Sequence, residues 1–184
     1  MLSFTPFPVM CTENLLLRRM HHNDAGDLFE MRKDHRMNVH TDTIPDESID
    51  ETHEYIDKMN KGVDNNKWII WAIEHKQSKK VIGSISIWNI DALRGSAELG
   101  YGIIPEYQGR GLMKEALLKV INYVFSVMGL ELLEAYTEES NTSSAKLLES
   151  CDFIVADRVD DQGYINDRVY HMLVYRLENN KINV

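Results

Sequence analysis

A glycine-bearing segment in the middle of the chain constrains the fold more than any other feature of the sequence. Residues 100–116 read GYGIIPEYQGRGLMKEA, in which a strand-like pattern ends at Pro105 and a helical pattern begins at Leu112. Gly109 and Gly111 allow the backbone of the intervening loop to approach a ligand closely. The unpaired N–H groups of a helix start, with the positive end of the helix dipole behind them, favour an anion. The segment therefore predicts a strand, an anion-binding loop and a helix.

Two better-known phosphate-binding motifs do not fit this segment. A dinucleotide fingerprint that starts at Gly100 would need a glycine where Pro105 stands, and no glycine-lysine pair with a hydroxyl residue marks a Walker loop. On glycine spacing alone, a tight turn before a helix explains Gly109 and Gly111 equally well. The wider sequence has to decide between the two interpretations.

Strand-like and helix-like patterns alternate along the rest of the chain. Segments rich in β-branched and aromatic residues predict strands, and apolar residues three or four apart predict helices. Gly129 is expected to cap the central helix, Gly62 to lie just beyond an earlier one, and the polar segment 159–168 to be a loop. The order predicts an α/β fold with mixed strand directions. Strands are expected at 15–18, 68–73, 81–88, 97–104, 132–137, 153–158 and 169–177, and helices at 24–31, 48–60, 112–128 and 141–151.

The composition is that of a chain with one buried core. The 184 residues, 43% of them hydrophobic, predict one domain of residues 1–184 with its core at about 12–178. No apolar run has the length of a membrane span and residues 1–10 lack a secretion signal, so we expect a cytoplasmic protein without a membrane partner. Cys11 and Cys151 show neither disulfide nor zinc spacing. The net charge of −9 argues against a nucleic-acid partner and suits an amine, although many inert proteins are equally acidic.

Residues 108–113, QGRGLM, resemble the signature of the GNAT superfamily of N-acetyltransferases. That signature has Gln or Arg, two variable residues, Gly, one variable residue, and then Gly or Ala. Met113 departs from the small residue at the last place, so the loop is expected to be less open there. Further matches point to the branch that acetylates the N-termini of ribosomal proteins, the Rim group. They are Leu16–Arg18, Ile82–Ser84, Ala97–Tyr101, Glu115–Ala116, Asn141 with Ser144 and Leu147–Leu148, and Asp167–Leu173.

The resemblance implies an acetyl-CoA-dependent N-acetyltransferase with a mostly antiparallel, twisted sheet of about seven strands and about four flanking helices. It implies that the N–H groups of residues 109–114 hold the coenzyme pyrophosphate and that strand backbone at Ile103 and Ile104 pairs with the pantetheine arm. Asn141 is implied to bond to the pantetheine nearby. The residues expected to bind the coenzyme are Ile103, Ile104, Gln108, Gly109, Arg110, Gly111, Leu112, Met113, Lys114 and Asn141.

Acetyl transfer needs a neutral amine, and it benefits from a proton or hydrogen bond to the departing thiolate. Because an N-terminus has a pKa of ~8 and a lysine one of ~10.4, a base is useful at pH 7. Glu98 matches the position of a catalytic glutamate in many superfamily members, with a solvated strand face as the plainer alternative. Leu148 stands where many members carry a tyrosine for the thiolate, so the resemblance points to Ser144. The plainer alternative there is that Asn141 caps a helix whose third residue is Ser144.

The acceptor is expected between residues 34–66 and residues 159–168, which match the family least. The leading interpretation is a protein or peptide N-terminus. The alternatives are a small amine, such as a polyamine, amino acid or aminoglycoside, and a non-catalytic acyl-CoA sensor, which turnover would exclude. The seven histidines show no metal spacing, so no metal is expected, and a monomer or a homodimer fits equally. Carboxylates in the two segments would favour a cation, or would simply form a solvated face: Asp42, Asp46, Glu47, Asp50, Glu51, Glu54, Asp57, Asp160, Asp161 and Asp167.

Overall fold

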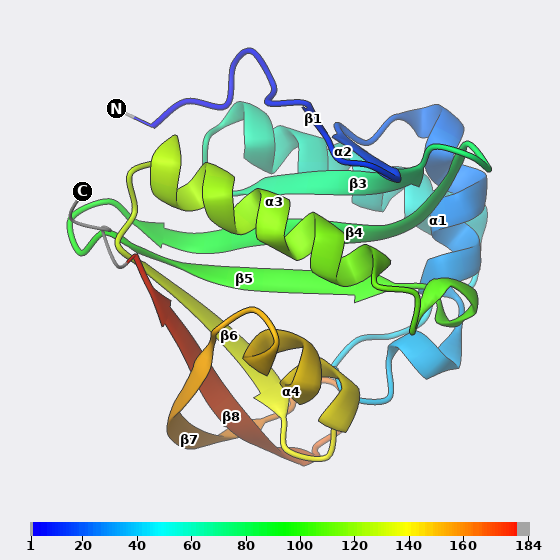
Figure 1. Ribbon diagram of the computed structural model, residues 1–184. Coiled ribbons are helices and arrows are strands. Elements are labelled where there is room, and N and C mark those ends of the chain that lie inside the picture. The colour runs from blue at the N-terminus through cyan, green and yellow to red at the C-terminus, as the bar shows by residue number, and fades with distance from the viewer. Residues whose placement is uncertain (1, 180–184) are drawn as a thin grey trace.

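The computed structural model describes residues 2–179, and its strands form one eight-stranded sheet (Figure 1). The strands are β1 (Met10–Cys11), β2 (Leu15–Arg18), β3 (Ile69–His75), β4 (Lys80–Asp91), β5 (Ser96–Ile103), β6 (Leu132–Glu138), β7 (Ile154–Gln162) and β8 (Val169–Glu178). Their order is β1-β2-β3-β4-β5-β6-β8-β7, and only β5 and β6 pair in parallel among the described strands. The mixed, mostly antiparallel sheet is confirmed. Residue 1 and residues 180–184 of the expected single domain lie outside the description, and that expectation stays a prediction.

Apart from shifts of one to three residues at strand ends, the strands differ from the predicted ones in two places. The additional strand β1 is only two residues long, too short for a sequence pattern, and it exists because it pairs with Leu16 and Leu17 of β2. The expected loop at 159–168 is wrong in its first part, because β7 continues to Gln162 in register with Val169. Every residue of β7 is exposed, and an edge strand of this kind tolerates the polar residues that suggested a loop.

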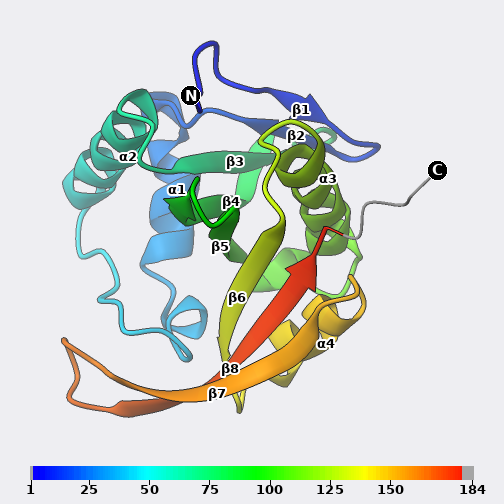
Figure 2. The same ribbon diagram turned by 90° about the vertical axis from the view of Figure 1, so that its left-hand side faces the viewer.

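Four α-helices flank the sheet within residues 2–179: α1 (Ala25–Arg32), α2 (Ile49–Asp64), α3 (Leu112–Ser126) and α4 (Thr142–Glu149). The helices α1 and α2 cover one face of the sheet, and α3 and α4 cover the other (Figures 1 and 2). The apolar side chains that predicted α3, Leu117, Val120 and Val124, are fully buried. None of the helices in this part of the chain has the length and apolar character that a membrane crossing requires.

The helix α2 ends at Asp64, beyond the predicted end near Asn60, so Gly62 lies inside it and does not follow it as predicted. The reason is a tertiary contact. An ideal Cβ on Gly62 would lie 1.9–2.4 Å from three atoms of the Trp68 indole. That indole donates to the Met59 carbonyl at 3.1 Å and packs against Trp88 with ring centroids 4.8 Å apart. Gly62 is therefore a packing glycine.

The strands β5 and β6 separate after a short shared ladder. They pair only at Ser96 with Leu132, Ala97 with Leu133, and Glu98 with Glu134, although β5 continues to Ile103 and β6 to Glu138. On their outer sides, β5 pairs with β4 along its length and β6 pairs with β8 along its length. We call the place where β5 and β6 diverge, beyond Glu98 and Glu134, the fork. It divides the sheet into two halves that splay apart (Figure 1).

Replacing Gly62 with alanine tests the packing of Trp68. The added methyl group cannot fit without moving the indole, so we expect Gly62→Ala to lower the free energy of unfolding by about 1–3 kcal/mol. Gly26→Ala in α1 is the matched control, because a Cβ there meets no atom within 4 Å. It should leave stability unchanged or raise it by about 0.5–1 kcal/mol. Urea denaturation measures both, and equal effects would contradict the steric explanation.

Candidate active site

A cavity of about 620 Å³ lies at the fork and connects the two faces of the sheet. Tyr101 and Gly102 are consecutive on β5, so they face opposite sides. Tyr101 contacts α4, whereas an ideal Cβ on Gly102 would lie 3.2 Å from Met37, which follows α1. The lining residues are Arg36, Met37, His40, Thr41, Tyr101, Gly102, Ile103, Tyr107, Gln108, Gly109, Gly111, Leu112, Met113, Lys114, Asn141, Ser143, Ser144, Lys146 and Leu147.

The glycine loop delivers the start of α3 to this cavity. Gly109 and Gly111 have φ values of +70° and +77°, in the left-handed region that favours glycine, and a Cβ on either would meet no atom within 4 Å. Backbone conformation, and not crowding, thus requires these glycines. Gly111 is the N-cap of α3 and supplies no side-chain cap, so the N–H groups of the first turn face the cavity without an intrahelical partner. Of the predicted loop residues, Arg110 is absent from the lining, and its guanidinium lies 5.2 Å from the Tyr107 ring centre.

The free edge of β5 forms one wall of the cavity. Ile104 donates its N–H to the Ile82 carbonyl at 2.9 Å, on the β4 side. Because successive backbone groups of a strand point to opposite edges, those of Ile103 and Tyr101 face the fork. The Gln108 side chain donates to the Ile103 carbonyl at 3.0 Å and so fastens the glycine loop to the strand. The structure therefore brings Ile103 and Gln108 to the cavity and turns the Ile104 N–H away from it.

Two hydroxyl groups meet across the cavity where α4 faces β5. The Tyr101 Oη and Ser144 Oγ atoms are 2.8 Å apart. Burial raises the pKa of Tyr101 to about 12, so this phenol is neutral at ordinary pH. The Asn141 side chain accepts from the Ser144 backbone N–H at 3.1 Å, which is the predicted helix cap. Sequence reasoning missed Tyr101 as a site residue, although it lies on the same face of β5 as the buried Leu99 and Ile103.

Glu98 lies at the fork but does not line the cavity. It is opposite Trp88 on β4 and Glu134 on β6, so these side chains share the face that α1 and α2 cover. The Glu98 carboxylate is half-buried.

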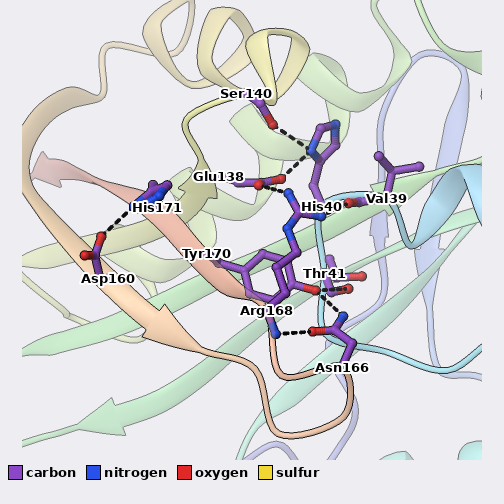
Figure 3. A network of polar contacts seen from close by, with 10 residues as sticks. All are labelled: Val39, His40, Thr41, Glu138, Ser140, Asp160, Asn166, Arg168, Tyr170 and His171. Carbon is purple, nitrogen blue, oxygen red and sulfur yellow. Dashed lines mark hydrogen bonds and ion pairs between the residues drawn. The ribbon is translucent and has the colours of Figure 1, made fainter.

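The segment 38–43 is joined to the hairpin of β7 and β8 by a polar network (Figure 3). At its centre is Glu138, the last residue of β6, whose side chain is only 7% exposed. Its Oε2 atom lies 2.7 Å from His40 Nδ1, and its Oε1 atom pairs with Arg168. Burial raises the pKa of Glu138, but the hydrogen bonds from His40 and Ser140 and the charge of Arg168 hold it below its usual value. Sequence reasoning had no signal for this network, since its members are far apart in the chain.

Two of the acidic residues that suggested a cationic acceptor, Asp42 and Asp46, have structural partners. Buried Asp46 pairs with Arg32 at 2.7 Å and accepts from Thr52, and Asp42 accepts from backbone N–H groups of the hairpin loop. None of the described aspartates or glutamates lines the cavity. Its ionisable side chains, tyrosines aside, are Arg36, His40, Lys114 and Lys146. Within residues 2–179 there is also no cluster of three or more His, Cys, Asp or Glu that could hold a metal ion.

Comparisons with known proteins identify the family. The acetyltransferase (GNAT) domain family matches residues 14–154. The uncharacterized N-acetyltransferase YoaA of Bacillus subtilis is 29% identical over 93% of this chain and 97% of its own length. The spermidine N(1)-acetyltransferase of Vibrio cholerae is 25% identical over 84% of this chain and 87% of its own length.

Solved structures share the fold. RimJ of Mycobacterium smegmatis, in complex with CoA-disulfide, superposes with a TM-score of 0.85 at 16% identity, over 96% of this chain and 89% of that one. The spermidine N-acetyltransferase of Vibrio cholerae, in complex with CoA and spermine, superposes with a TM-score of 0.77 at 24% identity, over 90% and 95%. The family match and the fold agree with the resemblance in residues 108–113. The chain belongs to the GNAT acetyltransferase family and is an N-acetyltransferase.

Proposed function

We propose that this N-acetyltransferase uses acetyl-CoA and transfers the acetyl group directly to the N-terminal amine of a protein or peptide. The observation that carries the proposal is the cavity at the fork, which is lined by the uncapped start of α3 and by residues from both faces of the sheet. One face can take the coenzyme and the other the acceptor. The two reactants can therefore meet inside the sheet without a covalent enzyme intermediate.

The residues of the cavity fit the parts of acetyl-CoA. The first-turn N–H groups of α3 and the ammonium group of Lys114 suit the pyrophosphate, since both favour negative charge. The free edge of β5 at Ile103 suits the amide groups of the pantetheine arm, which can pair with it as another strand would. Asn141, the N-cap of α4, also lines the cavity, so its side-chain N–H groups can donate to the pantetheine arm. Relatives of known structure that contain CoA support this assignment.

The paired hydroxyls of Tyr101 and Ser144 suit the departing thiolate. Two hydroxyl groups carry two hydrogens, and the bond between them uses one. The other hydrogen is available to a nearby acceptor. Because the pKa of Tyr101 is about 12, both hydrogens are present at neutral pH. A hydrogen bond to the sulfur would strengthen as charge develops on it, and it would therefore stabilise the transition state more than the substrate.

The charge of the cavity favours a peptide N-terminus as the acceptor. Arg36 and His40 line the cavity. A polyamine carries several positive charges, which the charge of Arg36 would repel. A peptide N-terminus presents a single amine, which need only be neutral to react. The second candidate is a polyamine. It is supported by the sequence similarity to a spermidine acetyltransferase and by the exposed carboxylates of α2, such as Asp50 and Glu54.

Thiol release tests the proposed function. The purified chain is incubated with acetyl-CoA and peptides, each with its N-terminus free or blocked, and in parallel with polyamines, amino acids and aminoglycosides. We expect release of free thiol that depends on a free peptide N-terminus. Faster turnover of polyamines than of any peptide would favour the second candidate. No thiol release with any amine, together with tight CoA binding, would refute the proposed function.

Ser144→Ala tests the role of the paired hydroxyls. The variant loses a hydrogen bond to a developing charge, which contributes about 1.5–3 kcal/mol, so kcat should fall by roughly 10- to 150-fold. The KM for acetyl-CoA should change little. Ser150→Ala is the control, since Ser150 lies just after α4, outside the cavity lining, and its Oγ donates to the Leu147 carbonyl at 2.8 Å. An equal effect of both substitutions on kcat would refute the role of Ser144.

A further inference from the structure

His40 and Glu138 form a carboxylate–imidazole pair at the edge of the cavity. The Nδ1 atom of His40 lies 2.7 Å from Oε2 of Glu138 and 3.3 Å from Oγ of Ser140 (Figure 3). The Glu138 side chain is 7% exposed, whereas that of His40 is 31% exposed and belongs to the cavity lining. The Glu138 carboxylate is thus buried, and the His40 ring borders the cavity.

The pairing decides where the imidazole carries its proton. An ionised carboxylate only accepts hydrogen bonds, so the Nδ1 atom that contacts Glu138 must be the donor. In the neutral ring the Nε2 atom then has the free lone pair. Figure 3 shows this second nitrogen on the side of the ring that points away from Glu138 and Ser140. The arrangement therefore prepares His40 Nε2 to accept a proton.

The backbone on both sides of His40 is held in place. The Val39 carbonyl accepts from Arg168 at 3.2 Å, and the Thr41 carbonyl accepts from Tyr170 Oη at 3.2 Å. Arg168 also pairs with the second oxygen of Glu138, and its guanidinium lies 4.7 Å from the Tyr170 ring centre. The same network that fixes Glu138 therefore fixes the ring that Glu138 orients. A catalytic base requires this kind of restraint, because proton transfer depends strongly on geometry.

The chain contains other histidine–carboxylate pairs outside the cavity, and one of them also uses the Nδ1 atom. His171 Nδ1 lies 2.8 Å from Asp160 on the hairpin of β7 and β8, and both side chains are exposed. Neither residue lines the cavity. What distinguishes His40 is therefore its position. It shares the cavity with Tyr101 and Ser144, and it lies near the end of β6 on the face opposite α4.

We propose that His40, oriented by Glu138, is the general base that takes the proton from the attacking amine. This assignment rests on the proposed function. The amine nitrogen forms a bond to the thioester carbon and gives its proton to His40 Nε2. The carbon–sulfur bond breaks and its electron pair leaves with the sulfur, on the side of Tyr101 and Ser144. The proton on His40 then passes to solvent, so the products are the amide, the thiolate and one proton.

Several charged groups surround His40. Glu138 of β6 faces its Nδ1 atom, and Arg168 lies behind Glu138. Arg36 of the preceding turn and Lys146 of α4 line the same cavity. A histidine base works only when it is unprotonated, so kcat should fall at low pH. His40→Gln, which keeps a donor toward Glu138 but has no basic nitrogen, should lose this acid limb.

Steady-state kinetics of matched variants test the proposal, with the acceptor that the thiol-release assay identifies. His40→Gln should lower kcat by about 100-fold or more, while the KM for acetyl-CoA changes little. His171→Gln removes the exposed histidine of the same pairing type and should leave kcat within about threefold of the wild type. A His40→Gln enzyme that retains the wild-type kcat and acid limb would overturn the proposal. Loss of the acid limb in Glu98→Gln alone would assign the base to Glu98 and would also overturn it.

Chemical rescue separates a proton acceptor from a structural ring. Added imidazole should restore turnover to His40→Ala, whereas pyrazole, a ring of the same size and much weaker basicity, should not. Equal rescue by both rings, or rescue by neither in a variant that still binds CoA and unfolds cooperatively, would show that His40 is not the base. Wild-type turnover is measured in each experiment. Failure of the proposed function, seen as no wild-type turnover, is thereby distinguished from failure of the His40 assignment.

Discussion

The early end of the ladder between β5 and β6 is the constraint on which the rest of the structure depends. Each strand has a complete antiparallel partner on its outer side, β4 for β5 and β8 for β6. Beyond Glu98 and Glu134, the two strands therefore do not depend on hydrogen bonds to each other. The twist of each half-sheet then carries the two strands apart. The fork leaves unpaired backbone on the edge of β5, and buried N–H and C=O groups require partners. A gap with unsatisfied strand edges is a place for an extended ligand.

The parallel relation of β5 and β6 also explains why a helix starts at the fork. A parallel pair needs a crossover connection, and α3 supplies it. The crossover leaves β5 at its carboxyl end, so the glycine loop and the first turn of α3 come to the open end of the gap. The positive φ angles of Gly109 and Gly111 turn the chain sharply enough to aim the N–H groups of that turn inward. Strand edge and helix start are thus two consequences of one connection.

On the opposite face, a buried charge organises the proposed acceptor side. A carboxylate as buried as that of Glu138 is stable only with close partners, because its desolvation is costly. Arg168 and His40 supply them from two segments that are 128 residues apart in the chain. These two contacts hold the segment 38–43 against the hairpin of β7 and β8. The restraint that satisfies the charge also orients the imidazole at the cavity, so stability and the proposed catalysis depend on the same contacts.

The sequence by itself determined most of the elements and the glycine loop before α3. Seven of the strands, the four helices and the turn at Gly109 and Gly111 follow from local periodicity and backbone preference, which are properties of neighbouring residues. Asn141 as a helix cap is local in the same way. Only the tertiary structure decided the place of Gly62 inside α2, the extension of β7, the turning away of Ile104 and the pairing of Tyr101 with Ser144. It also brought His40 to Glu138. Each of these depends on contacts between segments that are distant in the chain. Local sequence patterns do not show which distant residues come into contact.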